Sequence, residues 1–300
     1  MLDLRRLTVL RAVAREGSFS AAARTLDYTQ PAISHHVARL EAEVGTPLLV
    51  RTARGVRLTD AGQALVEHAD AVLARLASAE DEIAAIAGLR QGRVRLAAFP
   101  SASATLVPIA ARTLHDAHEA ITVSLVEAEP PEALALLRGG EVDVALVFGY
   151  PESDLISTRD LEVVPLLEDD LFVVLPAERR ARRVRLSNLA GETWIAGCER
   201  CRAHLLHLAG QAGFQPQIAY ATDDYVTVQG LVAAGLGVAL LPSLALAAVR
   251  RDDIATVPLA KPAARQIAAV LPAAPRHPPA VSAMIGALQS ATTTISPATG

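Results

Sequence analysis

No apolar run in this 300-residue sequence reaches the length of a membrane span, about 18 residues. Arginines at positions 5, 6, 11 and 15 also interrupt the apolar pattern of the N-terminus, so we expect no signal peptide. A nucleophile elbow, a phosphate-binding Gly-Lys-Ser/Thr loop and any other recognisable catalytic set are missing too. These absences predict a cytoplasmic protein that contacts no membrane, needs no cofactor and is not an enzyme.

The sequence also lacks an excess of positive charge, because its formal net charge is −4. Such a chain does not coat nucleic acid generally, and any DNA binding has to come from a local concentration of charge. Residues 1–60 supply one, since they contain nine arginines and six acids. Lys261 is the only lysine, which reflects an arginine-coding genome more readily than a function. The length allows roughly two domains, and 51% hydrophobic residues without a low-complexity tract predict an ordered globular chain.

Residues 18–45 have the pattern of two short helices joined by a tight turn. Ser18 can cap a helix that ends near Leu26, and Thr29 can cap a second helix that Gly45 ends. This is a helix-turn-helix, in which the first turns of the second helix meet base edges in the major groove. The side chains placed there are those of Gln30, Pro31, Ser34 and His35. Two short apolar runs after Gly45 flank an arginine-containing loop and predict a hairpin wing.

Four short segments carry more detail: Gly-Ser-Phe at 17–19, Thr-Gln-Pro-Ala-Ile-Ser at 29–34, Leu-Glu at 40–41, and Arg-Thr-x-x-Gly-Val-x-Leu-Thr at 51–59. Together they resemble the DNA-binding domain of the LysR-type transcriptional regulators. One departure is His35-His36, where the family commonly has Arg-Gln, and it affects base preference at one contact but not the docking mode. The resemblance implies binding to double-stranded DNA through Ser18, Thr29, Gln30, Pro31, Ser34 and His35, with Arg51 and Arg54 anchoring phosphates or reaching the minor groove.

Two further helices are expected around this unit. The first, about 3–16, places Leu4, Leu7, Leu10 and Val13 on one stripe that would brace the helix-turn-helix. Thr59 can cap the second, which runs to about Leu89 and has apolar residues in steps of four and three: Leu65, Ala69, Val72, Leu76, Ala79, Ile83 and Ile86. Such a heptad seam is satisfied most simply by the same helix of a second copy, and the alternative is an amphipathic helix lying on its own domain. The resemblance favours a homodimer or tetramer that reads an inverted repeat.

From Val94 onward, short apolar strands alternate with helices in two sets, up to a closing helix near 281–288. This alternation predicts an α/β fold with a largely parallel sheet covered on both faces, here in two lobes. The region is similar to the effector domain of the same family, whose fold resembles type 2 periplasmic binding proteins. The resemblance places a winged helix-turn-helix at 1–59, a linker helix at 60–91 and an effector-binding domain at 92–295. Lobe one would be about 92–163 and 265–293, and lobe two about 164–264.

Ligands of open α/β folds gather at the carboxyl ends of strands, where helix N-termini offer free N–H groups. Three stretches of this kind are residues 100–103, 197–201 and 222–224. Ser, Thr and Asp at such positions also serve as ordinary caps, so each has a structural alternative, most of all Asp223. By resemblance, a small metabolite, often a carboxylate, would bind between the lobes. The candidate effector contacts are Ser101, Ser103, Phe148, Cys198, Cys201 and Thr222.

The two cysteines form a Cys-x-x-Cys at a predicted helix start, where the helix dipole and Arg200 or Arg202 would lower a thiol pKa. His204 and His207 extend the motif, so redox switching and metal binding are both chemically open. Some relatives of the family sense peroxide through a cysteine pair in this lobe. The interpretation we prefer is that the cysteines line the effector cleft, and we expect no metal, because steps of three drift around a helix.

The sequence thus predicts a DNA-binding transcriptional regulator whose activity is controlled by a small-molecule effector. The alternative is a thiol-redox or metal-responsive regulator of the same family that acts through Cys198 and Cys201. An enzyme on the α/β region with an accessory DNA-binding head is a third class, and the missing catalytic set argues against it.

Overall fold

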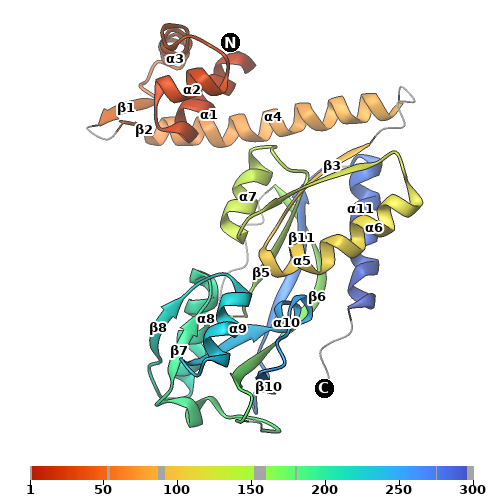
Figure 1. Cartoon of the computed structure of the whole chain (residues 1–300). Coiled ribbons are helices and arrows are strands. Elements are labelled where there is room, and N and C mark those ends of the chain that lie inside the picture. The colour runs from red at the N-terminus through yellow and green to blue at the C-terminus, as the bar shows by residue number, and fades with distance from the viewer. Residues whose placement is uncertain are drawn as a thin grey trace.

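The computed structural model describes residues 2–52, 55–86, 92–151, 160–179, 181–274 and 276–295, without the side chains of residues 51, 74, 77, 78, 80–82 and 84–86. An N-terminal helical domain and a long helix lie across one end of two α/β lobes (Figure 1). Across these ranges, no helix has both the length and the apolar character needed to cross a membrane.

The N-terminal domain contains three helices and a wing. Its helices begin at the caps expected from the sequence, since the Ser18 Oγ accepts from the Ala21 N–H at 3.4 Å and the Thr29 Oγ1 from the Ala32 N–H at 3.4 Å. Gly45 ends the recognition helix with a φ of 74°, a left-handed conformation that glycine adopts without a steric cost. The elements are α1 (Leu4–Glu16), α2 (Phe19–Thr25), α3 (Gln30–Val44), β1 (Leu49–Thr52) and β2 (Gly55–Leu58).

The three helices pack through the apolar stripes that their spacing predicts. On α1, Leu7, Leu10 and Val13 are buried, but Leu4, expected on the same stripe, is 41% exposed because it opens the helix beyond the packed turns. The wing is held to α3 by the Glu41 carboxylate, which accepts from the backbone N–H groups of residues 48 and 49 at 2.8 and 3.2 Å. Glu41 therefore fixes the wing relative to the recognition helix.

The long helix α4 (Asp60–Ile86) begins where the Thr59 Oγ1 accepts from the Gly62 N–H at 3.0 Å. Its heptad seam divides into two parts. Leu65 and Ala69 pack against the helices of the N-terminal domain. Further along, Val72, Leu76 and Ile83 are 48%, 43% and 66% exposed.

The C-terminal α/β domain is built on one continuous path of strands in the order β4-β3-β5-β11-β6-β9-β7-β8, with β10 paired to β6. The pairs β3/β4, β3/β5, β7/β8 and β7/β9 are parallel, whereas every pair formed by β6 or β11 is antiparallel. The expectation of a largely parallel sheet is therefore wrong for the strands that join the lobes. The strands are β3 (Arg93–Ala98), β4 (Thr122–Glu127), β5 (Val144–Gly149), β6 (Leu161–Pro176), β7 (Thr193–Ala196), β8 (Gln217–Ala221), β9 (Val238–Pro242), β10 (Ile254–Pro258) and β11 (Ala264–Pro272).

Helices cover both faces of each lobe. In lobe one, α6 and α11 enclose the larger core and α7 covers the opposite face. In lobe two, α8 packs over the core around Trp194, and α9 and α10 cover the other face. The helix expected from residue 102 is in fact two, α5 and α6. The helices are α5 (Pro100–Ala104), α6 (Leu106–Ala117), α7 (Pro130–Arg138), α8 (Glu199–Gln211), α9 (Tyr225–Ala233), α10 (Ser243–Ala248) and α11 (Pro279–Thr294), with a 3₁₀ turn at Leu186–Leu189.

The long strand β6 connects the two lobes. It pairs with β11 as far as Asp170 and with β9 from Leu171 onward. The change of partner falls at 170/171, a few residues beyond the lobe boundary expected at 163/164. The first part of β6 was not predicted, because Glu168, Asp169 and Asp170 interrupt the apolar pattern that marks a buried strand.

Candidate functional site

The predicted DNA-contacting side chains lie on the free face of α3. Gln30, Pro31 and His35 are exposed, and the Gln30 Nε2 donates to the Ser34 Oγ at 3.0 Å. Ser18 and Thr29 are engaged as helix caps. Arg54 lies outside the described residues, and Arg51 belongs to β1 without a described side chain.

One cation of this domain was missed by the sequence reasoning. Arg39 is exposed and lies four residues, about one turn, after His35 on α3, so that both side chains are on one helix face. This spacing is visible in the sequence and could have identified Arg39 as a candidate phosphate contact.

A second group of polar residues lies where the lobes meet, and its centre is Arg265. The guanidinium is fully buried, its Nε donates to the Asp169 Oδ2 at 2.9 Å and its Nη2 donates to the Ser101 Oγ at 2.7 Å. Asp169 is also fully buried and accepts from the Ser243 Oγ at 2.7 Å and the Leu244 N–H at 3.0 Å. The pair thus joins β6, β11, α5 and α10 at the point where the chain passes between the lobes.

Aromatic rings surround the same guanidinium. The Arg265 Cζ lies 4.5 Å from the centroid of the Phe148 ring and 4.9 Å from that of Phe99. Burial is the largest single influence and lowers the Arg265 pKa, but the Asp169 carboxylate acts with Tyr225, Tyr150 and Cys201 in the opposite direction, and the net shift of the Arg265 pKa is upward. Arg265 therefore stays a cation in a dry site. Phe148, an expected effector contact, is 1% exposed and forms the floor of this cluster.

Arg200, in the first turn of α8, brings a second guanidinium to the cluster, 5.9 Å from the centroid of the Phe148 ring. Its Nε and Nη2, together with the Nη1 of Arg265, are buried without a hydrogen-bond partner among the described residues. The Glu129 Oε2 is buried in the same way, and burial raises the Glu129 pKa above its ordinary value. The cluster therefore has buried donors that the described part of the protein leaves unsatisfied.

The two thiols lie beside this cluster and touch each other. Cys198 caps α8, and its Sγ–H donates to the Cys201 Sγ at 3.0 Å, while the Tyr150 hydroxyl donates to the same sulfur at 3.6 Å. The hydrogen bond from Cys198, aided by the Arg265 charge, lowers the pKa of Cys201 although burial opposes this. Donating that bond raises the pKa of Cys198. Arg265 is thus the nearby cation, in place of the Arg200 or Arg202 expected from the sequence.

The two histidines of the extended cysteine motif contact other side chains. The His204 ring stacks on the Tyr150 ring with centroids 3.8 Å apart, and the His207 Nε2 lies 2.8 Å from the Gln211 Nε2. Within the described ranges, no group of three or more His, Cys, Asp or Glu side chains is placed to hold a metal ion.

The structure brings four of the six predicted effector contacts together: Ser101, Phe148, Cys198 and Cys201. Ser103 is used within lobe one, because its Oγ donates to the Ala98 carbonyl at 3.1 Å. The Thr222 Oγ1 accepts from the Asp224 N–H at 3.2 Å, and Asp224, in place of Asp223, caps α9. Arg265, Asp169 and Glu129 were missed as functional candidates, and Arg200 was considered only for its effect on a thiol pKa.

Comparison with known proteins identifies the class of this chain. The model of the bacterial regulatory helix-turn-helix protein, lysR family, matches residues 4–63, and that of the LysR substrate binding domain matches residues 87–293. A probable HTH-type transcriptional regulator, LrrA, from Synechococcus elongatus is 30% identical over 291 residues, 96% of this chain and 97% of the relative. A hydrogen peroxide-inducible genes activator from Dickeya chrysanthemi is 30% identical over 278 residues, 90% of this chain and 89% of the relative.

A solved full-length structure has the same fold. A variant of OxyR from Pseudomonas aeruginosa superimposes with a TM-score of 0.70 at 22% identity, covering 97% of this chain and 95% of that one. The two domain models and the full-length relatives agree with the helix-turn-helix and the two-lobed domain described above. The chain therefore belongs to the LysR family of DNA-binding transcriptional regulators, which are not enzymes.

Proposed function

We propose that this regulator is controlled by a small organic anion that binds between its lobes, on Arg200, Arg265 and Phe148. The observation that carries the proposal is the set of buried guanidinium N–H groups that have no partner in the described part of the chain. An unsatisfied buried donor costs about 1–3 kcal/mol. A carboxylate accepts two N–H bonds from one guanidinium in a planar arrangement, so it removes this cost with good geometry.

The two guanidinium groups come from different lobes. Arg200 belongs to α8 of lobe two, whereas Phe148 lies near the end of β5 of lobe one and Arg265 lies at the start of β11. An anion held by both favours the conformation in which the lobes are close, because it gains its full set of contacts only there. Closure is the change that we expect to alter DNA binding.

Isothermal titration of the full-length protein with carboxylates tests this proposal. The panel is chosen from the chemistry of the genes next to the DNA fragments that the protein enriches from its genome. Arg200→Gln should lower the affinity for a binding carboxylate at least tenfold. Arg202→Gln is the matched control, because Arg202 is exposed on the same helix and should leave the affinity unchanged. Equal affinities of both variants and the parent protein would refute the anion site.

Oxidation of the thiol pair is the second candidate signal, and the 3.0 Å contact between the Cys198 and Cys201 sulfurs favours it. The Cys201 thiolate would attack a hydroperoxide, release water or an alcohol and become a sulfenic acid. The Cys198 thiol would then displace water from that sulfur and form a disulfide. One named relative is a hydrogen peroxide-inducible activator.

Mass spectrometry and DNA titration with and without peroxide distinguish the two signals. A redox sensor should lose two hydrogens per chain and change its DNA affinity, while Cys201→Ser should do neither. If peroxide forms the disulfide but leaves DNA binding unchanged, the thiols only line the cleft.

We further propose a homodimer formed through the exposed apolar residues of α4, which would present two α3 helices to an inverted repeat. Among the described side chains of α4, Val72, Leu76 and Ile83 are the large apolar ones that are exposed. Sedimentation of Leu76→Glu should show dissociation at concentrations where Arg75→Glu, an exposed neighbour, stays associated. The proposal fails if both variants associate like the parent protein.

A further inference from the structure

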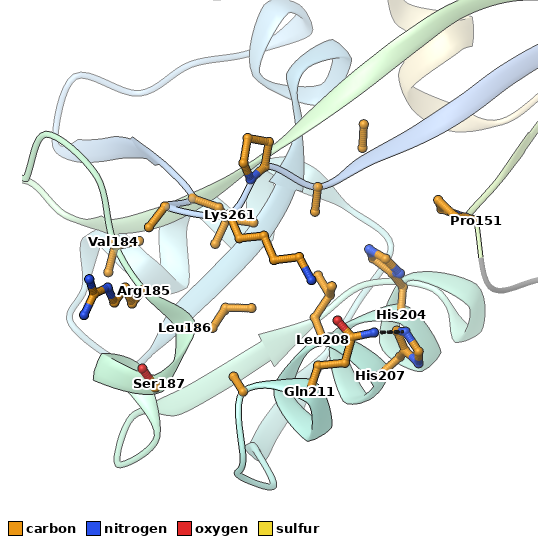
Figure 2. A pocket seen from close by; sticks show the side chains of 16 residues that line it. Pro151, Val184, Arg185, Leu186, Ser187, His204, His207, Leu208, Gln211 and Lys261 are labelled. Carbon is orange, nitrogen blue, oxygen red and sulfur yellow. Dashed lines mark hydrogen bonds between the residues drawn. The ribbon is translucent and has the colours of Figure 1, made fainter.

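A cavity of about 850 Å³ lies on lobe two, behind the site between the lobes. Helix α8 forms one wall, and residues 184–187 and 259–264 form the others (Figure 2). Pro151, which follows β5, closes one end. The cavity is separate from the anion site proposed above, because neither Arg200, Arg265, Phe148 nor the cysteines line it.

The lining combines cationic and apolar groups. Lys261 and Arg185 are its cationic residues, and Leu186, Leu208 and Pro262 are apolar. Among the sixteen described residues that line the cavity, none is an aspartate or a glutamate. The Lys261 side chain extends across the cavity toward α8, and no ion pair of Lys261 occurs within the described ranges (Figure 2).

We propose that this cavity is a second binding site, for a small organic monoanion with an apolar body. Lys261 would hold the anionic group, and the leucines and Pro262 would cover the body of the ligand. The volume is within the range of small-molecule sites, about 300–1,000 Å³, and an apolar lining with few convergent polar groups is typical of them. The absence of carboxylates from the lining selects an anion over a cation.

The position of the cavity allows a ligand bound there to influence the anion site proposed between the lobes. Residues 259–264 lead directly into Arg265, and the backbone of Val184 pairs with Leu259 in this wall. On the other side, the lining residue His204 stacks on Tyr150, whose hydroxyl donates to Cys201. A ligand in the cavity therefore touches the segment that joins the lobes and the back of the thiol cluster. Binding at the two sites is expected to be coupled, with equal effects in both directions.

Because Lys261 is the only lysine, acetylation with an amine-selective reagent tests the proposal on the full-length protein. We would measure the acetylation rate of Lys261 by peptide mass spectrometry, with the terminal amino group as the internal control. The probe is 3-phenylpropionate, and its neutral amide is the comparison. The probe should slow acetylation of Lys261 severalfold and saturably without affecting the terminal amine, while the amide should not slow it. No protection, or equal protection by the amide, would overturn the proposal.

Two variants separate this site from the anion site between the lobes. Lys261→Met should weaken binding of 3-phenylpropionate at this site about tenfold, whereas Arg250→Gln, which removes an exposed cation of the same lobe outside the cavity, should not. Arg200→Gln should leave the protection of Lys261 intact. If Arg200→Gln abolishes the protection, the probe acts from the first site and the second site is refuted, while the first proposal stands.

Discussion

The buried ion pair between Arg265 and Asp169 should be the most sensitive point of the effector domain, and Asp169→Asn tests this. The substitution keeps the size of the side chain but removes its charge and replaces one acceptor oxygen by an amide. Asp169 accepts from Arg265, Ser243 and Leu244, and both members of the ion pair are fully buried. The variant therefore leaves a guanidinium in the interior without its counter-charge.

The expected loss follows from this burial. Removing one partner of a buried pair costs about 3–5 kcal/mol, because the remaining charge is left uncompensated in a medium of low polarity. A domain has a free energy of unfolding of only about 5–15 kcal/mol, so the loss is a large fraction of it. The exposed pair Arg112–Asp116 gives a matched comparison, because its side chains are 76% and 54% exposed and pairs of this kind contribute about 0.3–0.5 kcal/mol.

Urea unfolding followed by tryptophan fluorescence measures both effects. Trp194 is the only tryptophan and is fully buried in the core of lobe two, so its emission reports on the unfolding of lobe two. Asp169→Asn should shift the midpoint strongly to lower urea, and Asp116→Asn should hardly move it. Similar small shifts for both variants would refute the assignment of Arg265 as a buried cation that depends on Asp169.

Three further predictions concern pH, DNA and the contact between the domains. Burial raises the Glu129 pKa in the folded state above its ordinary value of 4.5, so the folded protein loses stability as the pH rises through these pKa values and Glu129 ionises. Glu129→Gln should therefore stabilise the protein at pH 7 but not well below pH 4.5. Urea unfolding curves at the two pH values measure this difference. His35→Ala should weaken binding to the preferred DNA site by about 1–3 kcal/mol with little effect on other sequences, whereas Arg39→Gln should weaken both and flatten the salt dependence in fluorescence titrations. Arg11→Ala removes a 2.6 Å hydrogen bond to the Gly139 carbonyl, and should leave effector affinity intact but reduce the effect of the effector on DNA affinity; an unchanged effect would contradict a role for this contact.

The features that could be predicted from the sequence depend on local signals. The helix-turn-helix was predictable because Ser18, Thr29 and Gly45 act on backbone groups within a few residues of themselves. The contact of the two cysteines follows from their spacing at the start of a helix. The domain bounds stay a prediction.

The centre of the effector site was not predictable in the same way. Arg265 and Asp169 are 96 residues apart, and they meet only because β11 pairs antiparallel with β6 in a register that places them opposite each other. Single-sequence patterns contain no information on that register. The acids at 168–170 even argued against a strand, because the burial of Asp169 depends on an arginine that is distant in the sequence, and Glu168 and Asp170 are exposed.

The contacts between the N-terminal domain and the effector domain limit how a signal can reach DNA. Arg11 on α1 donates to the Gly139 carbonyl, and Arg15 donates to Glu141 at 2.9 Å, so the described contacts fall just after α7, in lobe one. The other end of α7, about 14 Å away along its nine residues, follows Glu129, which lies in the buried cluster around Arg265. Helix α7 and the β5 strand that ends near Phe148 share one core. If the proposed effector closes the lobes, we expect the contacts of Arg11 and Arg15 to keep the DNA-binding domain with lobe one while lobe two moves. We infer that closure changes the position of the recognition helices only where lobe two contacts another copy of the chain, so the response to effector should require the oligomer.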